Sequence, residues 1–102
     1  MKDINGVLQY NGKKYRLVFN LNVMERIQEE YGTISAWGEM TDGASGEPNA
    51  KAVLFGLTEM INEGIDIQNE ENGTQEAFLT TKQVGRLLTA IGVQEATSVM
   101  GT

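Results

Sequence analysis

Hydrophobic and polar residues alternate on both sides of Asn11-Gly12, and this pattern predicts a β-hairpin over about residues 4–19. An Asn-Gly pair favours a type I′ turn, because both central residues of that turn have positive φ. With the turn at this pair, Tyr10 lies opposite Lys13, and the rest of the register follows. The predicted core face carries Ile4, Leu8, Tyr10, Tyr15, Leu17 and Phe19, and the predicted solvent face carries Val7, Gln9, Lys14, Arg16 and Val18.

The period then changes from two to about four, which predicts an amphipathic helix over residues 21–31. Asn20 or Asn22 can cap its start, and Gly32 can end it because glycine readily adopts a left-handed conformation. A lone hairpin is marginally stable in water, so its apolar face must pack on helices. The predicted apolar face of this helix consists of Val23, Met24, Ile27 and Tyr31.

The rest of the chain predicts further helices separated by polar segments. A helix over about 49–63 ends at Gly64, because glycine commonly follows the last helical residue. A chain of 102 residues suits one domain. We therefore expect an α+β fold, a single domain over residues 1–102 in which an N-terminal antiparallel β-hairpin packs on three to four α-helices. The other predicted segments are a helical turn at 35–40, a loop at 41–48, an acidic loop at about 65–77, and helices at about 81–91 and 93–100.

The composition excludes several kinds of chemistry. The chain contains no cysteine and no histidine, so thiolate chemistry, disulfides and the commonest general base and metal ligand are all missing. We therefore expect no enzyme activity, no catalytic residue, no metal site and no cofactor. No apolar run approaches the 18 residues of a membrane span, so no membrane partner is expected.

The negative charge is concentrated in one segment. Residues 52–81 contain six acidic residues and no basic one, which matches the net charge of −6 for the whole chain. Such a field repels phosphate backbones, so nucleic-acid binding is disfavoured, whereas a basic partner would be attracted. A solvated surface without a partner explains the same charge.

A calcium-binding loop does not fit this acidic segment. In a register that begins at Asp66, the sixth position, which requires glycine, is Glu71. In a register that begins at Gln68, the glycine is correct but the twelfth position is Leu79, which has no carboxylate.

Four apolar residues are candidates for binding a partner: Trp37, Phe55, Phe78 and Leu79. Trp37 precedes a glycine-rich loop, and Phe55 lies opposite the apolar arc of its helix, among Lys51 and Glu59. Either neighbouring elements cover these side chains, or they form an apolar patch offered to another protein, since aromatic anchors dominate many interfaces.

The segment YRLVFNLNVMERIQEEYG (residues 15–32), which follows the NGK turn, resembles the tail assembly chaperones of long-tailed bacteriophages. The later segments KAVLFGLTEMINEGI and TTKQVGRLLTAIG (residues 51–65 and 80–92) are similar to the second helix and the ending of that family. The likeness covers nearly the full chain as an order of elements, and its motifs are structural.

The resemblance implies a non-catalytic role in phage tail assembly. Chaperones of this family are expected to cover the aggregation-prone tape measure protein and to help deliver the tail tube protein. The expected location is the cytoplasm of the bacterial host, with a prophage or phage genome as the source. Homo-oligomerisation is compatible with such a role.

Two other hypotheses remain open. The chain can be a small structural component of the virion, such as a tail or head-completion protein. It can also be an acidic inhibitor or adaptor of a basic partner, as the charge of residues 52–81 suggests.

Overall fold

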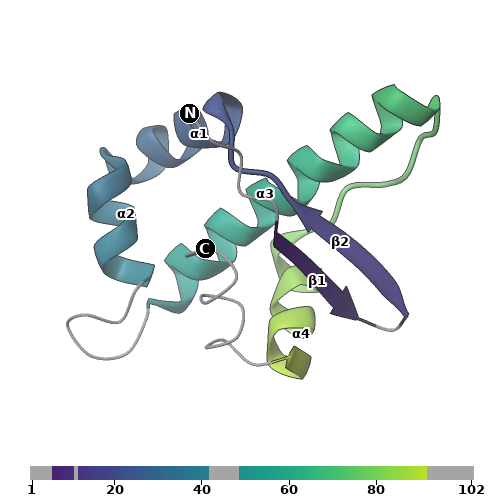
Figure 1. Ribbon diagram of the computed structural model, residues 1–102. Helices are drawn as coiled ribbons and strands as arrows, with labels where there is room; N and C mark the ends of the chain where they lie inside the picture. The colour runs from purple at the N-terminus through teal and green to yellow at the C-terminus, as the bar shows by residue number, and fades with distance from the viewer. Residues whose placement is uncertain (1–5, 11, 42–48, 92–102) are drawn as a thin grey trace.

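The computed structural model describes residues 6–10, 12–41 and 49–91 of the chain (Figure 1). Over these residues the fold is α+β, as predicted, with a two-stranded antiparallel hairpin followed by four helices. The long helix α3 runs through the middle of the molecule, and β2, α1, α2 and α4 all contact it. The elements are β1 (Gly6–Tyr10), β2 (Lys13–Leu17), α1 (Leu21–Tyr31), α2 (Ile34–Thr41), α3 (Ala50–Asn72) and α4 (Thr81–Ile91).

The register of the hairpin is the predicted one, with Tyr10 opposite Lys13 and Gly6 opposite Leu17. Gly12 has a φ of 75°, which a type I′ turn requires and which glycine adopts without steric cost. Leu8 and Leu17 are buried, so the predicted core face does point into the molecule.

The prediction that Val18 lies on the solvent face of the hairpin is wrong. Its side chain is 1% exposed, whereas alternation along the strand placed it among solvated residues. The reason is that β2 ends at Leu17, and the backbone N–H of Val18 donates to the carbonyl of Met60 on α3 instead of continuing the ladder (3.3 Å). The period of two therefore stops one residue before Val18.

Helix α1 begins and ends where the sequence predicts. Asn20 caps it, because its side-chain oxygen accepts from the backbone N–H of Val23 (3.2 Å). Gly32 follows its last residue with a φ of 87°. Val23 and Ile27 are buried against α3, as their spacing predicts.

The prediction of a helix over 49–63 followed by an acidic loop is wrong, because helix α3 continues past Gly64. It runs to Asn72 and is capped by Gly73 in the left-handed conformation. Gly64 does not end the helix. A Cβ at position 64 would lie 2.5 Å from the backbone oxygen of Arg16, so the glycine allows β2 to approach α3 closely. Residues 65–72 of the predicted acidic loop therefore belong to the helix, and only the segment between Gly73 and α4 is irregular.

Two asparagines of α3 fix the segment after Gly73. The Asn69 side chain accepts from the backbone N–H of Glu76 (3.0 Å) and donates to its carbonyl (3.1 Å). The Asn62 side chain makes the same pair of hydrogen bonds with the backbone of Leu79, at 2.8 and 2.9 Å. The chain thereby returns along α3 before α4 begins.

Helix α4 confirms the predicted helix over 81–91. Thr80 and Gln83 form a capping box. The backbone N–H of Gln83 donates to the Thr80 hydroxyl, and the backbone N–H of Thr80 donates to the side-chain oxygen of Gln83. Its buried stripe is Val84, Leu87 and Leu88. The predicted helix at 93–100, most of the loop at 41–48, and Ile4 lie outside the described residues.

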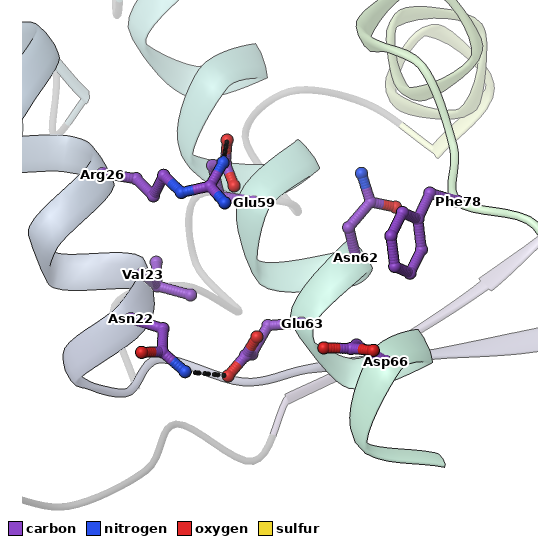
Figure 2. A pocket seen from close by; sticks show the side chains of 8 residues that line it. All are labelled: Asn22, Val23, Arg26, Glu59, Asn62, Glu63, Asp66 and Phe78. Atoms are coloured by element: carbon purple, nitrogen blue, oxygen red, sulfur yellow. Dashed lines mark hydrogen bonds and ion pairs between the residues drawn. The ribbon is translucent and has the colours of Figure 1, made fainter. Parts of the chain in front are cut away.

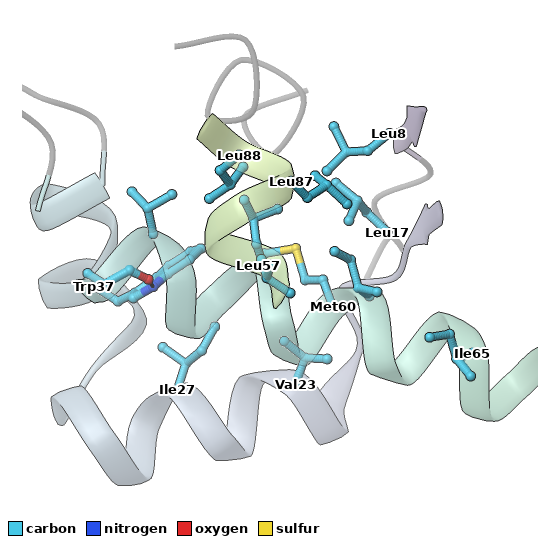
Figure 3. Packing of buried hydrophobic residues seen from close by; sticks show 14 residues of the cluster. Leu8, Leu17, Val23, Ile27, Trp37, Leu57, Met60, Ile65, Leu87 and Leu88 are labelled. Atoms are coloured by element: carbon cyan, nitrogen blue, oxygen red, sulfur yellow. Dashed lines mark hydrogen bonds between the residues drawn. The ribbon is translucent and has the colours of Figure 1, made fainter. Parts of the chain in front are cut away.

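The hydrophobic core forms where α3 meets the hairpin, α1, α2 and α4 (Figure 3). Leu57, Met60 and Ile61 lie at its centre and have no exposed surface. Figure 3 shows Trp37 at one end of this core and Ile65 at the other. Because α3 contributes to the core along most of its length, it is the scaffold that positions both surface hollows described below.

Candidate functional site

Two hollows in the described surface are candidates for a binding site. The first, which we call the polar notch, lies between α1, α3 and the segment before α4, and has a volume of about 190 Å³. The second, which we call the α3–α4 groove, lies between the first turns of α3 and the exposed side of α4, and has a volume of about 490 Å³. They differ in the chemistry of their side chains.

The polar notch is built from carboxylates of α3 that face α1 (Figure 2). Glu63 accepts hydrogen bonds from the side-chain amides of Asn20 and Asn22, the latter at 3.0 Å. Glu59 forms an ion pair with Arg26 of α1 at 3.6 Å. Figure 2 shows the Phe78 ring beside Asn62, on the side of the notch opposite α1. These contacts join α1 to α3.

This arrangement has little catalytic capacity. Two of the three carboxylates that line the notch, Glu59 and Glu63, are already engaged by side chains of α1 or its N-cap, and the third, Asp66, is exposed. Among the described residues, no three acidic side chains come together in a way that could hold a metal ion. The notch is therefore best explained as the polar border of the α1–α3 contact.

The α3–α4 groove is lined mainly by apolar and small residues. Helix α4 lies at an angle to α3 (Figure 1), and the groove is lined by residues from the first turns of α3 and from α4. Gly85 contributes to its width, because a Cβ there would meet only the Leu54 side chain, at an ordinary contact distance of 3.7 Å. The apolar and small lining residues are Ala50, Val53, Leu54, Gly85 and Leu88.

Both charged residues in the described lining of the groove are basic. Lys82 and Arg86 lie one helical turn apart on α4, and both side chains are exposed. They are the only basic residues that follow Lys51 in the sequence. An acidic protein thus presents its one C-terminal pair of cations next to an apolar groove.

Trp37 is a core residue in the structure. It is 7% exposed, its indole N–H donates to the carbonyl of Ala52 (2.9 Å), and its ring stacks near Phe19. The sequence left open whether neighbouring elements cover this side chain, and α3 and Phe19, which follows β2, do so. Trp37 is therefore not part of the exposed surface.

Phe55 is also covered, by the end of α1. Its ring makes an edge-to-face contact with Tyr31, with ring centroids 5.6 Å apart, and the side chain is half-buried. The side of α3 that looked polar in the sequence faces α1, which explains why an aromatic residue lies there. Trp37 and Phe55 therefore do not form a common surface patch.

Phe78 and Leu79 differ although they are adjacent. Phe78 is 55% exposed at the border of the polar notch, so it stays available to a partner. Leu79 packs against the core, and its backbone is held by Asn62. The structure thus keeps one of the four predicted partner-binding side chains largely on the surface.

The groove was not predicted from the sequence. Hydrophobic periodicity places Leu54 and Leu88 on the apolar faces of their helices, and in the structure Leu88 is buried whereas Leu54 is only half-buried. Gly85 gave the one available signal, because a glycine inside a helix is unfavourable and usually has a packing or functional reason.

No helix in the described part of the chain is both long and apolar enough to cross a membrane. Comparisons with protein families, with curated proteins and with solved structures found no match. The groove and the exposed Phe78 are the features from which a function can be inferred.

Proposed function

We propose that this protein is a non-catalytic tail assembly chaperone of a long-tailed bacteriophage, and that it binds the tape measure protein while the tail is built. The observation that supports the proposal most strongly is the α3–α4 groove. It is an open, mainly apolar hollow of about 490 Å³ on an acidic protein.

A groove between two helices suits a helical client. An amphipathic helix can lay its apolar stripe along Ala50, Leu54 and Gly85, and repeated apolar residues at i, i+3, i+4 and i+7 would supply the anchors. Covering that stripe removes from water the surface through which a long client would aggregate.

The acidic surface supports the same role. The last turns of α3 carry Asp66, Glu70 and Glu71, all exposed. A carboxylate-rich surface at the other end of α3 helps to keep a complex with an apolar client soluble, because molecules of like charge repel each other.

The test is co-expression of the chain with the tape measure protein from the same genome. Gly85→Leu places a side chain in the groove, whereas Gly85→Ala adds only the Cβ that has room there. We expect the wild type and Gly85→Ala to copurify with soluble tape measure protein, and Gly85→Leu to lose it without a decrease in melting temperature.

A second measurement distinguishes an assembly chaperone from a structural component of the virion. Mass spectrometry of purified phage particles should detect the tape measure protein and not this chain, because an assembly chaperone leaves the finished tail. Stoichiometric amounts of the chain in particles would instead make it a structural component of the virion.

A further inference from the structure

We infer that the segment bound in the α3–α4 groove is an amphipathic helix whose apolar stripe is flanked by acidic residues, which pair with Lys82 and Arg86. This inference rests on the proposed function in taking the groove as the client site. It adds the chemistry by which a client segment is selected.

The charges of the groove carry the inference. Among the residues that the structure describes, its lining contains two basic side chains and no acidic one, although acidic residues outnumber basic ones 14 to 8 in the whole chain. The ion pairs in the described part of the chain are Lys13–Glu76 and Arg26–Glu59. Neither pair involves Lys82 or Arg86, so both cations can receive carboxylates from a partner.

The position of Lys82 strengthens this interpretation. It lies in the first turn of α4, where the partial positive charge of the helix disfavours a cation. No acidic residue is present in that turn to compensate. A lysine placed there contributes nothing evident to the stability of α4, but together with the helix end it makes this side of the groove attractive to carboxylates.

The spacing of the two cations fits a helical partner. Residues 82 and 86 are separated by one turn, so their side chains lie along the same edge of the groove. Acidic residues four apart on a client helix would face both of them while its apolar stripe contacts Ala50 and Leu54, the apolar lining residues that keep exposed surface. Complementary charge would fix the orientation of the client and exclude basic segments.

Three synthetic peptides test the inference against the full chain. Each has about 18 residues, because shorter helices are marginal in water, and each carries the same leucine stripe. The residues that flank the stripe are glutamate in the first, glutamine in the second and lysine in the third. Binding is measured by fluorescence anisotropy at low and high salt, and NMR of the leucine methyl groups locates the peptide.

We expect the glutamate peptide to bind at least about tenfold more tightly than the lysine peptide at low salt, with the difference shrinking at high salt. It should shift the methyl signals of Leu54 and Leu88. The double variant Lys82→Glu, Arg86→Glu should reverse the preference. Lys14→Glu, Arg16→Glu, on the exposed face of β2, is the matched control with the same change in charge and should leave the preference unchanged.

Equal binding of the three peptides, or methyl shifts confined to residues outside the groove, would overturn the inference. Contacts in the free chain between the methyl groups of Leu88 and those of Val99 or Met100 would also overturn it, because the occupant would then be the chain itself. Dimerisation that Gly85→Leu abolishes would make a second copy the occupant.

The two proposals can fail separately. If the peptide preference holds but the tape measure protein does not copurify with the wild type, the proposed function is wrong and the selectivity of the groove stands. If the tape measure protein copurifies equally with the wild type and with Lys82→Glu, Arg86→Glu, the function stands and the acidic flank is wrong.

Discussion

Gly56 of α3 lies directly against the indole ring of Trp37. A Cβ at position 56 would overlap Cζ2 of the ring and lie 2.8 Å from Cε2. The absence of a side chain on α3 thus makes room for the largest side chain of the core. It also lets the indole N–H reach the carbonyl of Ala52.

Gly56→Ala should therefore destabilise the protein. The added methyl group forces the indole out of its position, and overpacking of this kind costs about 1–3 kcal/mol of the free energy of unfolding. Urea unfolding followed by Trp37 fluorescence measures the loss.

Gly85→Ala is the matched control for this substitution. It makes the same change inside a helix, but the new Cβ has ordinary contacts, the nearest at 3.7 Å. It should stabilise the protein by up to about 1 kcal/mol through helix propensity. Equal effects of the two substitutions would contradict the packing described for Trp37 and Gly56.

Asn62→Ala should loosen the segment that connects α3 to α4. It removes both hydrogen bonds to the backbone of Leu79, at 2.8 and 2.9 Å, and leaves two partly buried backbone groups without these partners. We expect a loss of about 1–3 kcal/mol in the free energy of unfolding. Hydrogen exchange should show faster exchange at the amide of Leu79.

The variant Asn62→Asp distinguishes the contributions of the two hydrogen bonds. Its carboxylate still accepts from the Leu79 amide but cannot donate to the carbonyl. The loss in the free energy of unfolding should be smaller for Asn62→Asp than for Asn62→Ala, and the Leu79 amide should largely keep its protection from hydrogen exchange. A loss as large as that of the alanine variant would show that the donated bond carries the whole effect.

Tyr31→Phe should stabilise the protein. The Tyr31 hydroxyl is buried and has no hydrogen-bond partner among the described residues, so its removal relieves a desolvation cost of about 1 kcal/mol. The ring contact with Phe55 is kept. Thermal unfolding of the two proteins at neutral pH measures the difference.

The same residue predicts a dependence on pH. Burial raises the pKa of the Tyr31 phenol above its usual 10.0, and the nearby Glu30 carboxylate raises it further. Above pH 10.0 the unfolded chain ionises before the folded one, so the contribution of this group to stability is complete below that pH and is lost as pH rises through the folded pKa. The advantage of Tyr31→Phe should therefore grow above pH 10.0, and a constant difference would contradict a raised pKa.

The elements that the sequence predicted well are those with local signals. The Asn11-Gly12 turn fixes the register of the hairpin, and Asn20 and Gly32 delimit α1. Helix α4 likewise has its own capping box and apolar stripe.

The length of α3 could not be predicted in this way. Gly64 looks like a helix end in the sequence, and only the approach of the Arg16 backbone explains why it is an interior residue. The cover over Phe55 likewise depends on Tyr31, which is 24 residues away and belongs to another helix.

The candidate site depends on tertiary structure even more strongly. The groove is lined by the first turns of α3 and by α4, which lies at an angle to α3 (Figure 1), and of its two leucines Leu54 is half-buried whereas Leu88 is buried. Hydrophobic periodicity assigns both leucines to a buried stripe and contains no information on the crossing. Gly85, Lys82 and Arg86 acquire their meaning only once the two helices are placed side by side.

The central claim is that the α3–α4 groove holds the client. Photo-crosslinking tests it most directly, with benzoylphenylalanine in place of Thr89, an exposed residue that lines the groove, or in place of Gln28, an exposed residue of α1 outside it. When each protein is co-expressed with the tape measure protein, we predict a crosslinked product from position 89 and none from position 28. A crosslink from position 28 without one from position 89 would contradict the account.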